Sequence, residues 1–242
     1  MKIVSQTDIG LVRHSNQDAC RDGVLPGGAV WAVVCDGMGG AQGGNVASSV
    51  AVDMISEQIT SAYRENMSEN SIKNLLTSAV YNANAAVFRK AMEDTALLGM
   101  GTTVVLALIA DGTAYIAHVG DSRAYLITPN EIRQLTNDHS VVQEMIDHGE
   151  LTHEQAKAHP RKNIITRALG VGAEVTADYS ETAFGEEDRL LLCSDGLTNY
   201  LDAETLLSLS SLAELDDLGG LLVEAAKKLG GSDNITVVLI GR

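Results

Sequence analysis

The sequence predicts a single domain of mixed class, in which strands and helices occupy separate blocks of the chain. Short apolar or alternating runs, typical of strands, occur near the start, in the middle and at the end of the 242 residues. Longer segments with apolar residues at helical spacing lie between these runs. Hydrophobic residues make up 45% of the chain, which is enough for a sizeable core. This separation of strand and helix blocks is typical of the α+β class.

The first part of the chain predicts two strands followed by two long helices. Residues 2–7 alternate in polarity, and residues 30–35 are apolar throughout, so we expect the second strand to be buried on both faces. The polar cluster at residues 13–18, taken alone, predicts a solvated loop. Residues 45–63 and 71–92 each carry an apolar stripe at helical spacing, which indicates helices packed on a core.

The middle of the chain predicts antiparallel strands. Residues 103–109, 113–119 and 123–127 are short runs of β-type residues. Asp111-Gly112, a strong hairpin signal, joins the first two runs, and Gly120-Asp121-Ser122 joins the second and third. Because these strands follow one another closely, we expect them to form a meander.

The chain becomes polar and less regular after a further predicted strand at residues 131–135. Residues 141–148 and 152–158 predict two short helices within this segment, which extends to about residue 173. Four of the six histidines lie here, and their spacing matches no common zinc site: His139, His148, His153 and His159. We therefore expect a surface subdomain beside a functional site instead of a metal cluster.

The last part of the chain predicts a strand, two helices and a closing strand. The strands are expected at residues 188–193 and 235–240, and the helices at residues 202–209 and 214–229. A glycine pair at residues 230–231 ends the second helix.

Charge and cysteine content exclude several classes of function. Acids outnumber bases by 32 to 17, and the resulting net charge of −15 disfavours binding to nucleic acid or anionic lipid. No apolar run approaches the ~20 residues of a membrane span, and no signal peptide is evident, so we expect a cytoplasmic protein. The three cysteines show no paired spacing, which indicates reduced thiols: Cys20, Cys35 and Cys193.

Four aspartates share one sequence context. Asp36 ends the apolar residues 29–35, and five of the next eight residues are glycine. The same order of apolar run, acid and glycine recurs around Asp195. Asp121 and Asp233 also lie at predicted strand boundaries, each with a glycine within two residues. Because strand ends gather along one edge of a sheet, we expect the four carboxylates to lie together.

Carboxylates that lie together repel one another unless cations neutralise them. Sites made only of oxygen ligands suit Mg²⁺ or Mn²⁺, and no His or Cys occurs among these acids to favour zinc. Two such ions about 3.5–4 Å apart are a recurrent device for phosphate ester hydrolysis. Arg13 is then a candidate clamp for the substrate phosphate, and nearby polar side chains are candidates to hold metal-bound water: Asn16, Gln17 and Asp18.

The ordered motifs of the whole chain resemble those of the metal-dependent protein phosphatases, the type 2C serine/threonine family. Six motifs occur in order: Arg13-x-x-Asn16-Gln17-Asp18, Asp36-Gly37-Met38-Gly39-Gly40, Gly120-Asp121-Ser122-Arg123, Asp138-His139-Ser140, Ser194-Asp195-Gly196-Leu197 and Asp233-Asn234. Each motif alone is weak, but six at sensible spacing are specific. Met38 followed by two glycines resembles the bacterial branch.

The resemblance implies a fold and a metal centre. The fold would be a four-layer α-β-β-α sandwich, with two antiparallel sheets flanked by helices and a small flap subdomain at about residues 143–175 of a single domain spanning residues 1–242. Two Mn²⁺ or Mg²⁺ ions would lie at one end, bridged by Asp36. The Gly37 carbonyl would bind the first ion, and Asp195 and Asp233 would complete the second. Asp121 with Asp195 would hold a third, weaker ion.

The resemblance also implies the reaction. Arg13 would bind the phosphate of a phosphoserine or phosphothreonine protein, and Asp18 would hydrogen-bond metal-bound water. Water activated by the two ions would attack the phosphorus directly. The leaving alkoxide also needs a proton, but two positions that carry histidine in many relatives carry Met38 and Ala41 here. A metal-bound water and His139 are the remaining candidate donors, and we expect His139 to be structural.

The sequence disfavours two other functions. A dinucleotide-binding module is disfavoured because Gly37-x-Gly39-x-x leads to Gln42 instead of a third glycine. A non-catalytic regulator with this fold is disfavoured because such proteins typically lose a metal-ligand aspartate, and all four are present.

The substrates implied are phosphorylated serine/threonine proteins, and a partner kinase would be encoded elsewhere. We expect a monomer.

Overall fold

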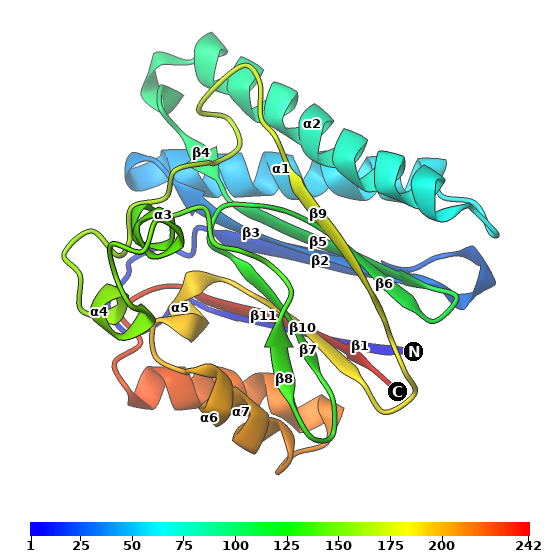
Figure 1. Cartoon of the computed structure of the whole chain (residues 1–242). Coiled ribbons are helices and arrows are strands. Elements are labelled where there is room, and N and C mark those ends of the chain that lie inside the picture. Colours follow the sequence, from blue (N-terminus) through cyan, green and yellow to red (C-terminus); the bar gives the residue numbers. More distant parts are fainter.

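The computed structural model describes the backbone of residues 1–242 and every side chain except those of residues 41 and 42. Two antiparallel sheets face each other, and helices cover the outer face of each sheet, so the chain forms four layers (Figure 1). The predicted α+β sandwich is therefore confirmed.

Both sheets are antiparallel throughout their described pairings. The first sheet contains, in spatial order, β2 (Asp18–Val24), β3 (Val30–Met38), β5 (Val104–Ala110), β6 (Thr113–Val119) and β9 (Asp178–Ala183), and β4 (Gly101–Thr102) pairs with the end of β3. The second sheet contains β1 (Lys2–Asp8), β11 (Ile235–Gly241), β10 (Arg189–Cys193), β7 (Arg123–Ile127) and β8 (Ile132–Gln134).

Helices cover the two outer faces and one end of the sandwich. The first sheet is covered by α1 (Gly40–Ala62) and α2 (Glu69–Glu93), and the second by α6 (Ala203–Ser210) and α7 (Leu215–Lys228) (Figure 1). Three short helices lie at the end of the sandwich: α3 (Val141–Asp147), α4 (His153–Lys157) and α5 (Asp195–Thr198). Two 3-10 turns, η1 (Pro26–Gly28) and η2 (Thr95–Leu97), complete the described elements.

The hydrophobic core is built on the apolar strands, whose side chains pack on both faces of each sheet. Trp31, Val33 and Cys35 point from β3 toward α1 and α2, whereas Val30 and Val34 point from the same strand into the space between the sheets. A strand of this kind is buried on both faces, as its uniform apolar sequence predicts. A third cluster packs α7 against the second sheet.

Two parts of the predicted fold were wrong or incomplete. The expected meander does not extend past β6, because β7 pairs with β10 and β8 in the other sheet. The chain therefore crosses between the sheets at Gly120-Asp121-Ser122. The edge strands β2 and β9 and the single-turn helix α5 were not predicted, and α1 begins at Gly40, before the predicted start at residue 45.

Two further predictions concern membranes and cysteines. Within the described part of the chain, none of the helices combines the length and the hydropathy that crossing a bilayer requires. Cys20, Cys35 and Cys193 are free thiols.

Candidate metal centre

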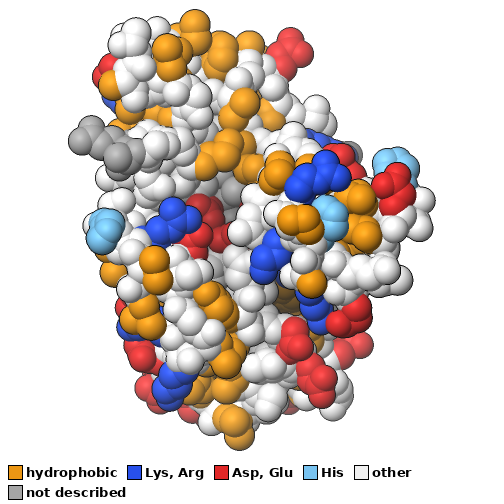
Figure 2. Space-filling model, turned by 90° about the vertical axis from the view of Figure 1, so that its left-hand side faces the viewer, with side chains coloured by type: hydrophobic (Ala, Val, Ile, Leu, Met, Phe, Trp, Pro, Cys, Tyr) orange, Lys and Arg blue, Asp and Glu red, His pale blue; other side chains and the backbone are white. Residues whose placement is uncertain are grey.

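Five aspartates from separate segments meet at the end of the sandwich that carries α3, α4 and α5. Asp36 lies near the end of β3, Asp121 in the crossing between the sheets, Asp195 at the start of α5 and Asp233 just before β11. Asp18, the first residue of β2, pairs in register with Asp36. Acidic side chains are visible in a hollow of this face, next to a basic one (Figure 2). The predicted gathering of the four acids is therefore what the fold produces.

The backbone around Asp36 is fixed by two threonines. The Asp36 N–H donates to Thr103 Oγ1 at 2.9 Å, and the Asp36 carbonyl accepts from Thr103 N at 2.8 Å and from Thr102 Oγ1 at 2.8 Å. Thr103 Oγ1 in turn lies 2.6 Å from Ser122 Oγ, and both side chains are buried. This hydroxyl pair joins the end of β3 to the turn that carries Asp121.

Gly37 must be a glycine because the backbone of α1 packs directly on it. A Cβ at residue 37 would lie 2.1 Å from the Gly44 carbonyl oxygen and 2.6 Å from that of Gln17. The Gly37 N–H donates to the same Gln17 oxygen at 3.1 Å. The glycine-rich stretch after Asp36 therefore lets a helix N-terminus approach the acidic cluster closely.

Burial and mutual repulsion raise the pKa values of these carboxyl groups. Burial, with Asp195 and Asp233 as neighbours, raises the pKa of Asp18 to about 7. Burial and the charge of Asp195 raise the pKa of Asp121 to about 7. The same causes raise the pKa of Asp36 well above its ordinary value, and that of Asp195 also rises. A protein that keeps these groups ionised at neutral pH needs cations among them.

Two of the carboxylate oxygens have no hydrogen-bond donor although they are buried. Asp195 Oδ1 and Asp18 Oδ1 lack a partner, whereas Asp195 Oδ2 accepts from Asn199 Nδ2 at 3.0 Å and Asp18 Oδ2 accepts from Ser194 Oγ at 2.7 Å. Orphaned anionic oxygens of this kind are costly unless an ion or its water ligands satisfy them. The donor set contains only oxygen, so it fits Mg²⁺ or Mn²⁺ better than zinc.

Arg13 lies at the edge of the acidic group, half exposed. Its Nη2 donates to Asp233 Oδ2 at 2.7 Å, and this contact raises the pKa of the guanidinium.

The loop before β2 is held by Asn234, whose side chain accepts from Gln17 N at 2.8 Å and donates to the Ile9 and Ser15 carbonyls, each at 3.0 Å. The sequence motif contained Asn234, but its role in holding this loop was not predicted.

Ser194 belongs to one of the sequence motifs but was not predicted as a functional residue. It accepts from Thr236 N at 3.0 Å and donates to Asp18, so it orients that carboxylate. The sequence signal for this role is the position of Ser194 between an apolar strand and Asp195, because a buried hydroxyl needs a hydrogen-bond partner.

Three positions bear on the proton that the leaving alkoxide needs. Met38 has no proton to give, and the side chain of Ala41 is outside the described residues. His139 is only 5% exposed, and its Nδ1 accepts from Gly120 N at 3.1 Å. The expectation that His139 is structural agrees with this burial.

The histidines of the polar segment do not gather into a metal site. Within the described chain, His139 belongs to a group of three potential ligands whose other members, His118 and Asp178, lie outside that segment. His148 and His153 are exposed, and His159 is partly buried.

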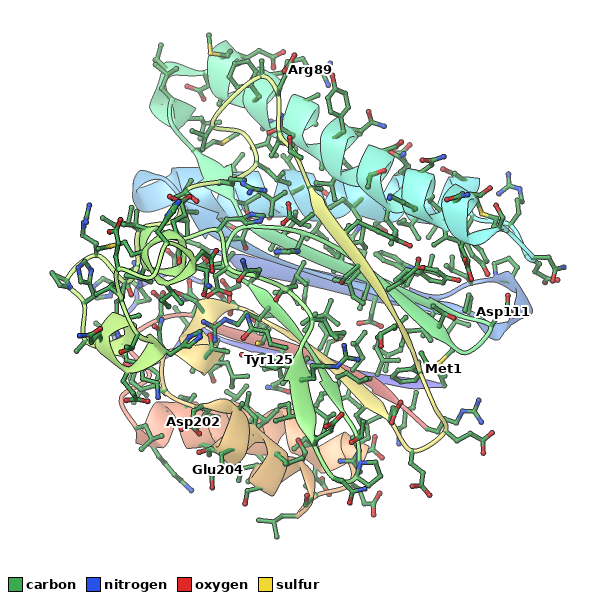
Figure 3. The ribbon with its side chains drawn as sticks, in the orientation of Figure 1. Met1, Arg89, Asp111, Tyr125, Asp202 and Glu204 are labelled. Carbon is green, nitrogen blue, oxygen red and sulfur yellow. The ribbon has the colours of Figure 1, made fainter. Side chains whose placement is uncertain are left out.

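A cavity of about 680 Å³ adjoins the acidic group. Asp121 and Asp195 lie on its wall, and residues of α3 and α4 lie opposite α5 and α6 around it. Tyr125 and Asp202, both labelled in Figure 3, are further lining residues. The cavity is large enough for a peptide side chain next to the carboxylates.

The comparisons with known proteins identify the family. A family model described as protein phosphatase 2C matches residues 12–219. The chain belongs to this family. It is 41% identical to the serine/threonine phosphatase stp of Listeria welshimeri, over 98% of this chain and 94% of that protein.

Solved structures of the family share the whole fold. The serine/threonine phosphatase Stp1 of Staphylococcus aureus superposes with a TM-score of 0.94 at 34% identity, over 100% of this chain and 94% of that one. The catalytic domain of the serine/threonine protein phosphatase PstP, solved in complex with two manganese ions, superposes with a TM-score of 0.87 at 32% identity, over 98% and 96% of the two chains. The family predicted from the motifs is confirmed.

Proposed function

We propose that this phosphatase 2C chain hydrolyses phosphoserine and phosphothreonine in proteins by direct attack of water, without a phosphoenzyme. One observation carries the proposal: buried carboxylates with raised pKa values and orphaned oxygens lie beside a half-exposed arginine. This combination is suited to holding divalent cations next to a phosphate.

The centre would hold two Mn²⁺ or Mg²⁺ ions. The candidate ligands are Asp36, the Gly37 carbonyl, Asp195 and Asp233, with Asp121 and Asp195 for a third, weaker ion. The manganese-bound PstP structure and the all-oxygen donor set support this assignment. When bound, such ions lower the pKa of water and draw charge from a phosphate.

The side chains of the chain itself would bind and orient the reactants. Arg13 would exchange its contact with Asp233 for the phosphate oxygens, since a guanidinium binds phosphate bidentately. Asp18, oriented by Ser194, would accept a hydrogen bond from water in the centre. The leaving alkoxide would take its proton from water in the cleft, because Met38 has none and His139 is buried.

The biological setting remains a proposal as well. The substrates would be serine/threonine-phosphorylated proteins, and a separately encoded kinase would supply them. We propose a cytoplasmic monomer that binds no nucleic acid, with one domain over residues 1–242. Residues 143–175, which include most of α3 and all of α4, would form the flap that contributes to substrate choice.

Hydrolysis of phosphopeptides in ¹⁸O-labelled water tests the reaction. With Mn²⁺ present, we expect phosphate to be released from phosphoserine and phosphothreonine peptides, to carry one ¹⁸O from a single turnover, and to leave no phosphorylated protein. Asp36→Asn should abolish release with the fold retained. A trapped phosphoenzyme would contradict direct attack, and release only from phosphotyrosine peptides would contradict the substrate class.

A further inference from the structure

His139 lies where three segments of the chain meet. Its backbone N–H donates to the Gly120 carbonyl at 2.9 Å, and its ring Nδ1 accepts from the Gly120 N–H at 3.1 Å. Its carbonyl accepts from Thr166 N at 2.8 Å, and Ser140 next to it forms a bridge with Ile165. His139 therefore contacts both ends of the polar segment and the turn that precedes Asp121.

The ring of His139 is oriented by its neighbours. Because Nδ1 accepts a hydrogen bond, the proton of the neutral ring is on Nε2, which lies 3.4 Å from Asp178 Oδ2 without an aligned hydrogen bond. Asp178 Oδ1 accepts from Arg167 Nη1 at 2.8 Å, which holds that carboxylate in place. One face of the ring stacks on His118, with ring centroids 4.8 Å apart.

The hydrogen bond at Nδ1 argues against a metal ion among His118, His139 and Asp178, although their ligand atoms lie within 4.8 Å of one another. An ion at His139 Nε2 would need the lone pair of that nitrogen, and the ring proton would move to Nδ1. That proton would point at the Gly120 N–H, which is itself a donor. The ring is thus built to hold the backbone of Gly120.

The turn formed by Gly120, Asp121 and Ser122 is fixed by contacts on both sides of Asp121. On one side, Ser122 Oγ lies 2.6 Å from Thr103 Oγ1, which connects to the Asp36 backbone. On the other side, Gly120 has a φ of +107°, and a Cβ there would lie 2.6 Å from Thr103, so the backbone has little room to shift. Without the acceptor on His139, the buried Gly120 N–H would have no partner.

We propose that His139 is a positioning residue for Asp121. Its Nδ1 fixes the Gly120 N–H, and this places the Asp121 carboxylate where it can bind an ion. Asp178 and Arg167 act through the ring by holding its orientation. The inference rests on the proposed role of Asp121 as a ligand of the weaker ion.

Two substitutions at residue 139 distinguish the roles of the two ring nitrogens. His139→Asn places an amide oxygen near the position of Nδ1 and keeps the acceptor for Gly120, whereas His139→Gln places its amide near Nε2 and loses that acceptor. Mn²⁺ binding would be measured by calorimetry, and folding by circular dichroism. We expect His139→Asn to bind the weaker ion within about threefold of the parent protein and His139→Gln to bind it about tenfold or more weakly, with the tighter ions unchanged in both.

Asp121→Asn is the reference for this experiment. If His139 acts through Asp121, adding His139→Gln to Asp121→Asn should weaken Mn²⁺ binding no further. If Asp121→Asn itself leaves every Mn²⁺ site unchanged, the proposed role of Asp121 fails. If Asp121→Asn weakens an ion and a folded His139→Gln does not, the positioning role alone is overturned.

A second variant keeps the test valid if His139→Gln does not fold. Asp178→Ala removes the carboxylate that faces Nε2, at a side chain that is 45% exposed and lies on an edge strand. We expect it to weaken the same ion and to spare the tighter ones. Unchanged Mn²⁺ binding in Asp178→Ala would contradict the orienting contact. If His139→Asn and His139→Gln both lose an ion that Asp121→Asn still binds, the histidines themselves would form a metal site, and the positioning role would be wrong.

Discussion

Arg13 is placed so that a phosphate can take over its hydrogen bonds. Its guanidinium is half exposed, and its ion pair with Asp233 lies at the edge of the carboxylate group. Arg13→Ala should raise KM for phosphopeptides and lower kcat/KM about 10- to 100-fold, because a charge-assisted hydrogen bond contributes about 1.5–3 kcal/mol. Steady-state kinetics at saturating Mn²⁺ would measure this.

Two further variants control for the arginine experiment. Arg13→Lys keeps the charge but loses the planar fork, so an intermediate loss is expected. Arg21→Ala removes an exposed arginine on β2 that pairs with Asp53 at 2.7 Å, and it should leave the kinetics unchanged. An Arg13→Ala protein with the KM of the parent would mean that another group binds the phosphate.

His118 and His139 are buried and should stay neutral in the folded protein. Burial lowers the pKa of His118, with Arg167 adding to this effect and Asn137, Asp178 and Asp138 opposing it. Burial, His118 and Arg167 lower the pKa of His139, and Asp178 opposes them. The unfolded chain therefore takes up protons near pH 6.5 that the folded protein does not, so stability is lost as the pH falls through that range.

The substitution His118→Gln tests whether stability is lost as the pH falls. His118→Gln retains a donor for the Asn137 carbonyl, which accepts from the ring Nε2 at 2.9 Å, but it does not titrate. In urea unfolding with constant Mn²⁺, the parent protein should lose more stability than His118→Gln between about pH 7.5 and about pH 5.5. Equal losses, or a larger loss in the variant, would show that the folded protein does not hold His118 neutral.

At the level of elements, the sequence predicted every interior strand of both sheets, and also the edge strands β1 and β8 of the second sheet. The segments of β3, β5 and β10 are mostly apolar because they are covered on both faces, and the sequence shows this directly. The edge strands β2 and β9 of the first sheet were missed, and they carry mostly polar, partly exposed residues. Polar edge strands of this kind are specified by pairing with a neighbour, which a local pattern does not reveal.

The crossing between the sheets could not be predicted either, because it also depends on tertiary packing. Residues Gly120, Asp121 and Ser122 are compatible with a hairpin turn, and only tertiary packing decides that β6 and β7 join different sheets. This crossing brings Asp121 to the acidic group, and the Thr103–Ser122 hydroxyl pair fixes it there.

Thr103→Val removes this fixation while keeping the shape of the side chain. The Asp36 N–H would lose its acceptor and Ser122 would lose its partner, so the free energy of unfolding should fall by about 1–3 kcal/mol. Mn²⁺ binding should weaken at the same time. Urea unfolding of Thr103→Val, Ser122→Ala and the double variant would measure the change, and the double variant should lose less than the sum of the two. A loss in Thr103→Val of a few tenths of a kcal/mol would mean that the pair contributes little.

For the whole molecule, the acidic centre is the product of topology. The sequence identified Asp36, Asp121, Asp195 and Asp233 because each follows or precedes a strand near a glycine, and the fold brings the segments to one end of the sandwich. It did not predict that Ser194 would orient Asp18 or that Arg13 would pair with Asp233, because these contacts join residues 176 and 220 positions apart. Contacts of that range depend on the completed fold.

Hydrolysis of p-nitrophenyl phosphate by the purified protein tests the central claim most directly. The assay would compare EDTA, Mg²⁺, Mn²⁺ and Zn²⁺, with Asp195→Ala beside the parent protein and circular dichroism to establish that both are folded. A centre built on these aspartates predicts no activity in EDTA, activity restored by Mn²⁺ or Mg²⁺, and loss of that activity in Asp195→Ala. A folded parent protein that binds Mn²⁺ in calorimetry but hydrolyses nothing with any metal would contradict the enzymatic account.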